Sequence, residues 1–277
     1  MGRWLIYLKE RFQLIPQLIL IGGLSLIAQP QIDSWAWVFA ALLLIFFLLR
    51  AMDETKDYEK DCVAHPERPL PQGLISRNEM KSLIDFLMFG MVGLSFLLGW
   101  TLSLTAGFMY FIMTGYLWAM FHEFKMKNFL SKRPLIYAIS HQLIVVPLSA
   151  FLIAARGNKS VLSSETLLIS MVLLGGFFAY EICRKLDPKA HPILKTYIHI
   201  YGKIPTVLLA GAAVMILSLC GYFLGLCRFL WPTALLLLAA LVDYCKSPSR
   251  FKAVENISII NLLACIYSLG IQTVVMS

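Results

Sequence analysis

The chain has 277 residues, of which 59% are hydrophobic and only 14% are charged, and its mean hydropathy is +0.74. Because a water-soluble domain carries about 25% charged residues, this composition excludes a soluble globular protein. The formal net charge is +8, but the basic residues stand in short segments between apolar runs and indicate membrane topology, not nucleic-acid binding. The six cysteines show no paired spacing, which argues against a disulfide framework or a zinc site.

Long apolar segments follow one another along the whole chain. A helix that spans a bilayer needs about 20 mostly apolar residues, and no soluble domain interrupts the succession. The sequence therefore predicts an all-α, polytopic membrane protein that forms a single domain over residues 1–277. The nine predicted spans cover residues 12–28, 35–51, 82–100, 103–121, 134–154, 164–182, 204–222, 228–244 and 256–275.

The lysines and arginines support this segmentation independently. With nine spans, 21 of the basic residues fall on one side and only Arg156, Lys159 and Arg228 fall on the other. Basic residues collect in cytoplasmic loops, so we expect the N-terminus and the two long polar loops in the cytoplasm. The C-terminus is then expected on the opposite side of the membrane.

Four carboxylates follow the second predicted span. Asp53, Asp57 and Asp61 recur every four residues and Glu54 lies beside them, so all four fall along one broad face if the helix continues. Like charges at this spacing destabilise a helix by about 0.2–0.5 kcal/mol per pair, which calls for nearby positive charge. One interpretation is a solvated segment neutralised by neighbouring lysines and arginines. The other is a magnesium site, because Mg²⁺ prefers oxygen ligands and commonly uses carboxylates together with substrate phosphates.

The segment after these carboxylates is stiff. It contains Pro66, Pro69, Pro71 and Gly73, residues that restrict and turn the backbone. We therefore expect Arg68 to be held back toward the carboxylates.

Together, the two segments resemble the UbiA-type intramembrane prenyltransferases. Asp53 to Asp61 is similar to that family's first acidic motif, NDxxDxxxD, and the Arg68 to Ser76 segment is similar to its RPLPxGxIS continuation. The resemblance implies about nine helices around a central cavity and Mg²⁺ as cofactor. It also implies a prenyl diphosphate donor, a lipophilic or aromatic acceptor, and catalytic roles for Asp57, Asp61 and Arg68. The metal ligands that it implies in this segment are Asp53, Glu54, Asp57 and Asp61.

A second polar segment follows the sixth predicted span. Glu181 and Asp187 are its only acidic residues, and they depart from the DxxxD spacing of the family's second acidic motif. The resemblance makes them further metal ligands, and it implies that Tyr180, Arg184 and Lys185 bind the diphosphate together with Arg68. The alternative is a helix end whose long side chains reach the interface.

The function that follows is a prenyltransferase, in which magnesium assists transfer of a prenyl group within the membrane. A transporter or a noncatalytic lipid-binding relative of the same fold is the alternative, since carboxylates near a membrane also serve ion pathways. The acceptor stays open among an aromatic acid, a quinone precursor, a tetrapyrrole and a sugar.

Overall fold

The structure is a computed structural model that describes residues 2–28, 32–157 and 160–275. Every regular element in these ranges is helical, and eight helices are long and apolar enough to span a membrane, or nine if one bent pair counts as a span. The predicted all-α membrane fold is confirmed. The helices are α1 (Arg3–Tyr7), α2 (Leu14–Ala28), α3 (Ile32–Ala64), α4 (Arg77–Thr101), α5 (Leu104–Phe121), α6 (Lys127–Leu130), α7 (Pro134–Gln142), α8 (Val145–Ala154), α9 (Ser164–Cys183), α10 (Tyr197–Tyr201), α11 (Lys203–Phe223), α12 (Cys227–Lys246) and α13 (Phe251–Val275).

Four short turns of helix complete the list of elements. A π-helix, η1 (Leu8–Phe12), joins α1 to α2, and 3₁₀ turns lie at η2 (Glu123–Lys125), η3 (Pro192–Leu194) and η4 (Pro248–Arg250). We call residues 3–12, which comprise α1 and η1, the N-terminal segment. It meets α2 at an angle of 61°, and Gln13 at the junction has a φ of 46°. The sequence predicted a span from residue 12 but not this helical segment before it.

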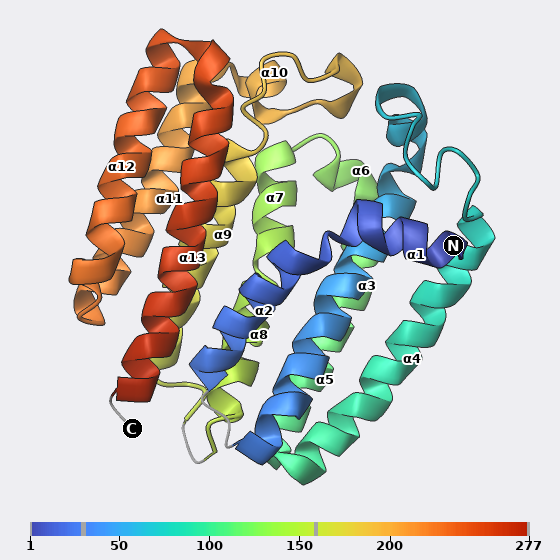
Figure 1. Cartoon of the computed structure of the whole chain (residues 1–277), viewed down its shortest axis with the longest axis vertical. Helices are drawn as coiled ribbons and strands as arrows, with labels where there is room; N and C mark the ends of the chain where they lie inside the picture. The colour runs from blue at the N-terminus through green and yellow to red at the C-terminus, as the bar shows by residue number, and fades with distance from the viewer. Residues whose placement is uncertain (1, 29–31, 158–159, 276–277) are drawn as a thin grey trace.

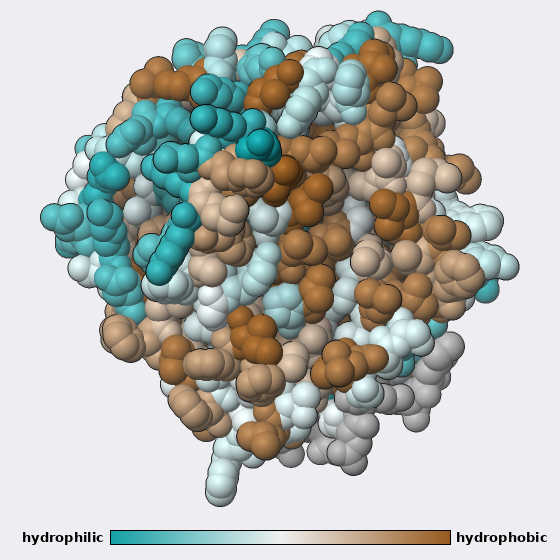
Figure 2. Space-filling view, turned by 180° about the vertical axis from the view of Figure 1, so that it is seen from behind, coloured by the Kyte–Doolittle hydropathy of each residue, from teal (hydrophilic) through white to brown (hydrophobic). Residues whose placement is uncertain are grey.

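The long helices lie side by side, and the two long polar segments stand together at one end of the bundle (Figure 1). We call this end, which carries residues 65–76 and 184–202, the loop end. α13 runs from the loop end to the opposite end, whereas α1 lies toward the loop end. Hydrophilic side chains gather toward the loop end, and tan and brown side chains cover much of the middle (Figure 2). This pattern suits a bundle whose middle lies in lipid.

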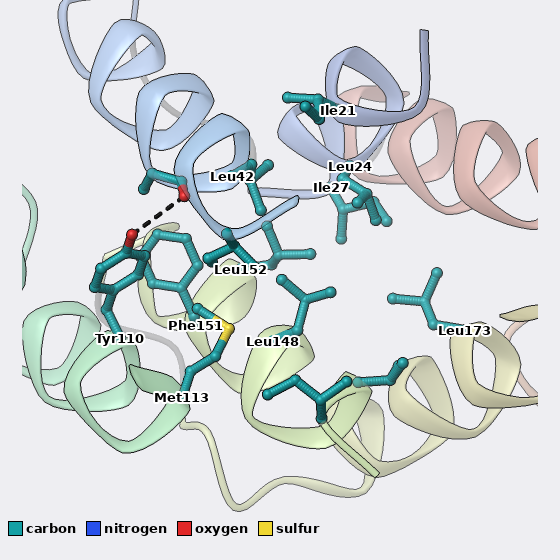
Figure 3. Packing of buried hydrophobic residues seen from close by; sticks show 14 of the residues in the cluster. Ile21, Leu24, Ile27, Leu42, Tyr110, Met113, Leu148, Phe151, Leu152 and Leu173 are labelled. Atoms are coloured by element: carbon teal, nitrogen blue, oxygen red, sulfur yellow. Dashed lines mark hydrogen bonds between the residues drawn. The ribbon is translucent and has the colours of Figure 1, made fainter. Parts of the chain in front are cut away.

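The buried core combines apolar packing with a few satisfied polar groups. Side chains of α2, α3, α5 and α8 meet there, and the Tyr110 hydroxyl donates a hydrogen bond of 3.2 Å to the carbonyl of Ala41 (Figure 3). Where α4 and α5 cross, Gly107 lies so close to Gly99 that an added Cβ would stand 2.6 Å from the Gly99 Cα. Small residues allow such close approach of helices in membranes.

At the end opposite the loop end, Arg156 links three helices. Arg156 donates from Nε to the carbonyl of Ile27 at 2.7 Å and from Nη2 to the Thr273 hydroxyl at 2.9 Å. Its Nη1 is 3.1 Å from a carboxylate oxygen of Glu165. One of the three basic residues predicted on this side therefore ties α2, α9 and α13 together. Lys159, another of the three, lies outside the described residues.

Candidate functional site

The second predicted span continues as one helix, α3, through the whole acidic segment to Ala64. Asp53 and Asp57 are exposed on neighbouring turns of this helix, and we call them the acidic face. Asp57 accepts a hydrogen bond of 3.0 Å from Lys60, while Asp53 has no ion-pair partner among the residues that the structure describes. Both carboxylates therefore keep oxygen atoms available to a ligand.

Asp61, one turn further on, has a different environment. It is only 4% exposed, and its Oδ2 lies 2.6 Å from Nη1 of Arg68. The loop returns because backbone amides cap its turns: Arg68 donates to the carbonyl of His65 and Gly73 to that of Leu70. Gly73 has a φ of 74°, which favours glycine. Arg68 thus turns back onto α3, where it neutralises Asp61.

Glu54 leaves the acidic face altogether. Its side chain is 3% exposed and lies under the N-terminal segment, where Arg11 and Arg50 contact its Oε1 at 2.6 and 2.8 Å. Sequence spacing placed Glu54 beside Asp57, but the structure pairs it with two guanidinium groups.

Lys56 is a site residue that we did not expect from the sequence. It stands between the two carboxylates of the acidic face in the chain, and its ammonium group donates to the carbonyl of Met120 at 3.3 Å. His141 donates from Nδ1 to the carbonyl of Tyr137, so its Nε2 is the acceptor for Lys56 at 3.1 Å. The same ammonium group lies 5.2 Å from the centre of the Tyr137 ring. Lys56 therefore joins α3 to α5 and α7 at the loop end.

A cleft of about 300 Å³ opens beside this lysine. Lys56, Glu59, Arg77 and Glu123 are among the side chains that line it, but the acidic face is not. The cleft therefore lies on a different side of α3 from Asp53 and Asp57.

The second polar segment begins where α9 ends at Cys183. Glu181 accepts from Nε of Arg184 at 2.6 Å, and its other oxygen lies 2.5 Å from Nζ of Lys185. Tyr180 is half-buried on the preceding turn. Asp187 instead accepts a hydrogen bond from the backbone amide of Lys189 at 2.9 Å and shapes the local turn. The helix thus ends four residues before Asp187, and the two acidic residues of this segment do not share a helical face.

The charge of Asp53 on the acidic face acts on the second polar segment. The charge of Glu181 raises the pKa of the Arg184 guanidinium, and the charge of Asp53 adds a smaller rise. Arg184 therefore remains a cation, which pairs with Glu181 of α9 and is stabilised further by the charge of Asp53 on α3. Lys185 adds a second cation, which lies 5.3 Å from the centre of the Tyr197 ring.

The carboxylates fit one mode of magnesium binding and not another. Among the described residues, no three histidine, cysteine, aspartate or glutamate side chains are grouped so that they could hold a metal ion. However, Mg²⁺ is commonly bound by one or two carboxylates plus substrate phosphates. Asp53 and Asp57 are exposed and meet that requirement, although Lys60 pairs with Asp57. Glu54 and Asp61 are instead buried in ion pairs with arginine, and Glu181 pairs with both Arg184 and Lys185.

Comparison with known proteins establishes the fold and the family of the chain. No curated protein matches the sequence. The chain is similar to a solved structure from work on digeranylgeranylglyceryl phosphate synthase in membranes. The two superpose with a TM-score of 0.63 at 18% identity, over 96% of this chain and 99% of that one. This likeness establishes a shared fold. The family model of the UbiA prenyltransferase family matches residues 17–248, which is most of the chain. This protein therefore belongs to the UbiA prenyltransferase family.

Proposed function

We propose that this protein transfers a prenyl group from a prenyl diphosphate to a lipophilic or aromatic acceptor within the membrane, with Mg²⁺ as cofactor. Family membership supports prenyl transfer in membranes. The observation that supports the finer proposal is the acidic face, two exposed carboxylates of α3, together with the charge of Asp53 acting on Arg184.

The charges suit a diphosphate whose tail lies in lipid. A prenyl diphosphate joins about three negative charges to a long apolar chain, so it sits with its charged end at the membrane surface. In the proposal, Asp53 and Asp57 hold Mg²⁺, which supplies positive charge against the leaving diphosphate. Arg184 and Lys185 bind the diphosphate oxygens directly, and Tyr180 adds a hydroxyl on the same helix.

Bond cleavage at the allylic carbon moves negative charge onto the diphosphate. Fixed cations stabilise that charge more in a site without water than in bulk solvent. Arg184 and Lys185 already pair with Glu181, so diphosphate binding must share or replace these ion pairs. Arg68 enters the proposal through Asp61: the pair fixes the loop that follows the acidic face, and Asp61 becomes a metal ligand only if Arg68 turns to the diphosphate.

The test is a product assay on purified protein in lipid nanodiscs. The protein is incubated with prenyl diphosphates of several lengths, Mg²⁺ and a membrane extract, and both diphosphate release and new prenylated products are measured. We expect Asp57→Asn to lower transfer by about 100-fold, as loss of a transition-state contact of about 2.7 kcal/mol would do. Absence of diphosphate release from every donor would refute the enzyme and favour the transporter or lipid-binding alternative.

Asp243 offers a matched control for that substitution. It is an aspartate near the end of α12 whose side chain is 43% exposed and pairs with Arg250 at 2.7 Å, much as Asp57 pairs with Lys60. Asp243→Asn removes a comparable surface charge without touching the acidic face, so transfer is expected to stay at the wild-type rate. Equal losses in both variants would contradict a specific role for Asp57.

A further inference from the structure

The buried pairing of Glu54 is the starting point for a further inference. Three hydrogen-bonding contacts converge on its Oε1: Arg11 Nε at 2.7 Å, Arg11 Nη2 at 2.6 Å and Arg50 Nη2 at 2.8 Å. Its Oε2 is buried without a hydrogen-bond partner. One oxygen is thus occupied and the other is enclosed, so Glu54 can reach a metal ion only by leaving this cluster.

Charge balance shows why the cluster holds together. Arg11, Arg50 and Glu54 together carry a net charge of +1, and the Arg11 and Glu54 side chains are only 14% and 2% exposed. A buried charge that loses its partner is costly, whereas loss of both partners costs much less. Each guanidinium therefore depends on the Glu54 carboxylate.

The N-terminal segment makes a second contact of the same kind. Arg3 lies 2.5 Å from Glu79, and Glu79 forms a capping box with Ser76 at the start of α4. Arg11 and Arg3 of one segment thus contact the two helices that flank the 65–76 loop. Phe12 adds an edge-on contact with Phe47 of α3, with ring centres 5.4 Å apart.

Local strain indicates that these contacts, and not backbone preference, hold the segment in place. Residues 8–12 form a π-helix, a rare form that is often found at functional sites. Gln13 follows with a left-handed φ of 46°, which is unfavourable for a residue with a side chain. The ion pairs to Glu54 and Glu79 oppose this strain.

We propose that Glu54 is a positioning residue and not a metal ligand. Paired with Arg11, it fixes the rotation of α3 so that Asp53 and Asp57 lie on the exposed acidic face. The N-terminal segment thereby becomes part of the catalytic machinery without contacting substrate. This inference rests on the proposed function, because it assigns a role in the same site.

The test uses charge balance in four proteins: wild type, Glu54→Gln, Arg11→Gln and the double variant. Glu54→Gln raises the net charge of the cluster to +2, Arg11→Gln lowers it to zero, and the double variant restores the wild-type value of +1. We expect Glu54→Gln to lower transfer by about 10- to 100-fold, the range seen when a supporting residue is lost. The double variant should recover to within about threefold of wild type, because the buried charges of Arg11 and Glu54 are removed together. Only Arg50, whose side chain is 32% exposed, then lacks its carboxylate.

Recovery of prenyl transfer in the double variant distinguishes a positioning role of Glu54 from metal ligation. A metal ligand cannot be restored by removing an arginine, so a double variant as inactive as Glu54→Gln, with the same raised magnesium requirement, would overturn the proposal. The matched control is Asp57→Asn with Lys60→Gln, an exposed pair on the acidic face, in which no rescue is expected. Rescue there as well would also overturn the proposal, because recovery would then reflect surface charge.

Melting temperatures of the same four proteins provide a readout that needs no activity. We expect Glu54→Gln, which leaves the buried Arg11 guanidinium unpaired, to melt below the double variant, whereas Arg11→Gln keeps the pair of Arg50 with Glu54. Failure of Glu54→Gln to fold while the double variant folds gives the same result. Additive effects of the two substitutions would overturn the pairing. If wild-type protein transfers no prenyl group, the proposed function fails, while the melting temperatures still decide whether Glu54 depends on Arg11.

Discussion

The crossing of α4 and α5 allows a stability prediction that can be worked out from atomic positions. A Cβ added to Gly107 would lie 2.4 Å from the Ser95 carbonyl oxygen and 2.6 Å from both the Cα and N of Gly99. Ordinary contacts of a Cβ fall between 3.4 and 4 Å. All three obstructing atoms belong to backbone, so no side chain can rotate away. Gly107→Ala must therefore move the two helices apart by about 1 Å, in a core packed as densely as a crystal.

The cost follows from known effects of overpacking. Extra methyl groups in a packed core cost about 1–3 kcal/mol, and the rigid backbone contacts place this case at the upper end. The higher helix propensity of alanine offsets about 1 kcal/mol at most. We expect a net loss of about 2 kcal/mol, which lowers the melting temperature by roughly 4–8 °C in a chain of this size.

Gly115 on the same helix is the matched control. A Cβ at that position would meet no atom within 4 Å, so Gly115→Ala changes helix propensity alone and should leave the melting temperature unchanged or slightly higher. Thermal unfolding of both variants in one detergent measures the difference. Equal melting temperatures for the two variants would refute the inferred close packing of α4 against α5.

Three further predictions concern ion pairs and the metal. Arg68→Ala leaves the buried carboxylate of Asp61 without its partner, and we expect a loss of about 3–5 kcal/mol in the free energy of unfolding; a melting temperature equal to that of wild type would contradict this. Arg156→Gln removes charged hydrogen bonds to Ile27 and Thr273 and should cost about 3 kcal/mol, measured by chemical unfolding against Arg228→Gln as control. In the proposed function only Asp53 and Asp57 bind the metal, so Mg²⁺ alone should barely change the melting temperature. Mg²⁺ with a prenyl diphosphate should stabilise the protein by about 2.7 kcal/mol at 100 times the dissociation constant, and stabilisation by Mg²⁺ alone would indicate a preformed metal site.

The features predicted well from sequence are those that depend on local spacing. Lipid requires long apolar helices whose backbone groups are satisfied internally, so each span could be located from composition alone. The continuation of α3 through Asp61 followed from the spacing of its carboxylates. The return of Arg68 followed from the prolines and glycine between it and Ser76. The ion pairs of Glu181 with Arg184 and Lys185 are also local, at separations of three and four residues, but we did not predict them: the resemblance made Glu181 a metal ligand.

The missed features depend on contacts between distant segments. Glu54 and Arg11 are 43 residues apart, and Lys56 and His141 are 85 apart, so no spacing rule connects them. Helical periodicity placed Glu54 near the edge of the acidic face. Its side chain turns away from that face because Arg11 and Arg50 pair with it in the buried interior. One signal in the sequence pointed to this pairing. Arg11 and Arg50 flank apolar segments, and an arginine that becomes buried there needs a carboxylate partner.

Membrane orientation is a prediction that one native cysteine can test. The excess of basic residues at the loop end predicts that this end faces the cytoplasm. Cys62 is exposed near the end of α3, whereas Cys183 and Cys265 are buried. A maleimide that cannot cross membranes should therefore label Cys62 in inside-out vesicles but not in right-side-out vesicles.

The label is located by mass spectrometry of peptides, with Cys62→Ser as the control that removes the signal. The buried thiols Cys183 and Cys265 should stay unmodified in both preparations until the protein is unfolded. Labelling of Cys62 from the outside would reverse the orientation. Asp53 and Asp57 lie one to three turns before Cys62 on the same helix, so the donor diphosphate would then have to reach them from the outer face. Because one helix carries both the thiol and the acidic face, this single measurement also fixes the side of the membrane that must supply the prenyl donor.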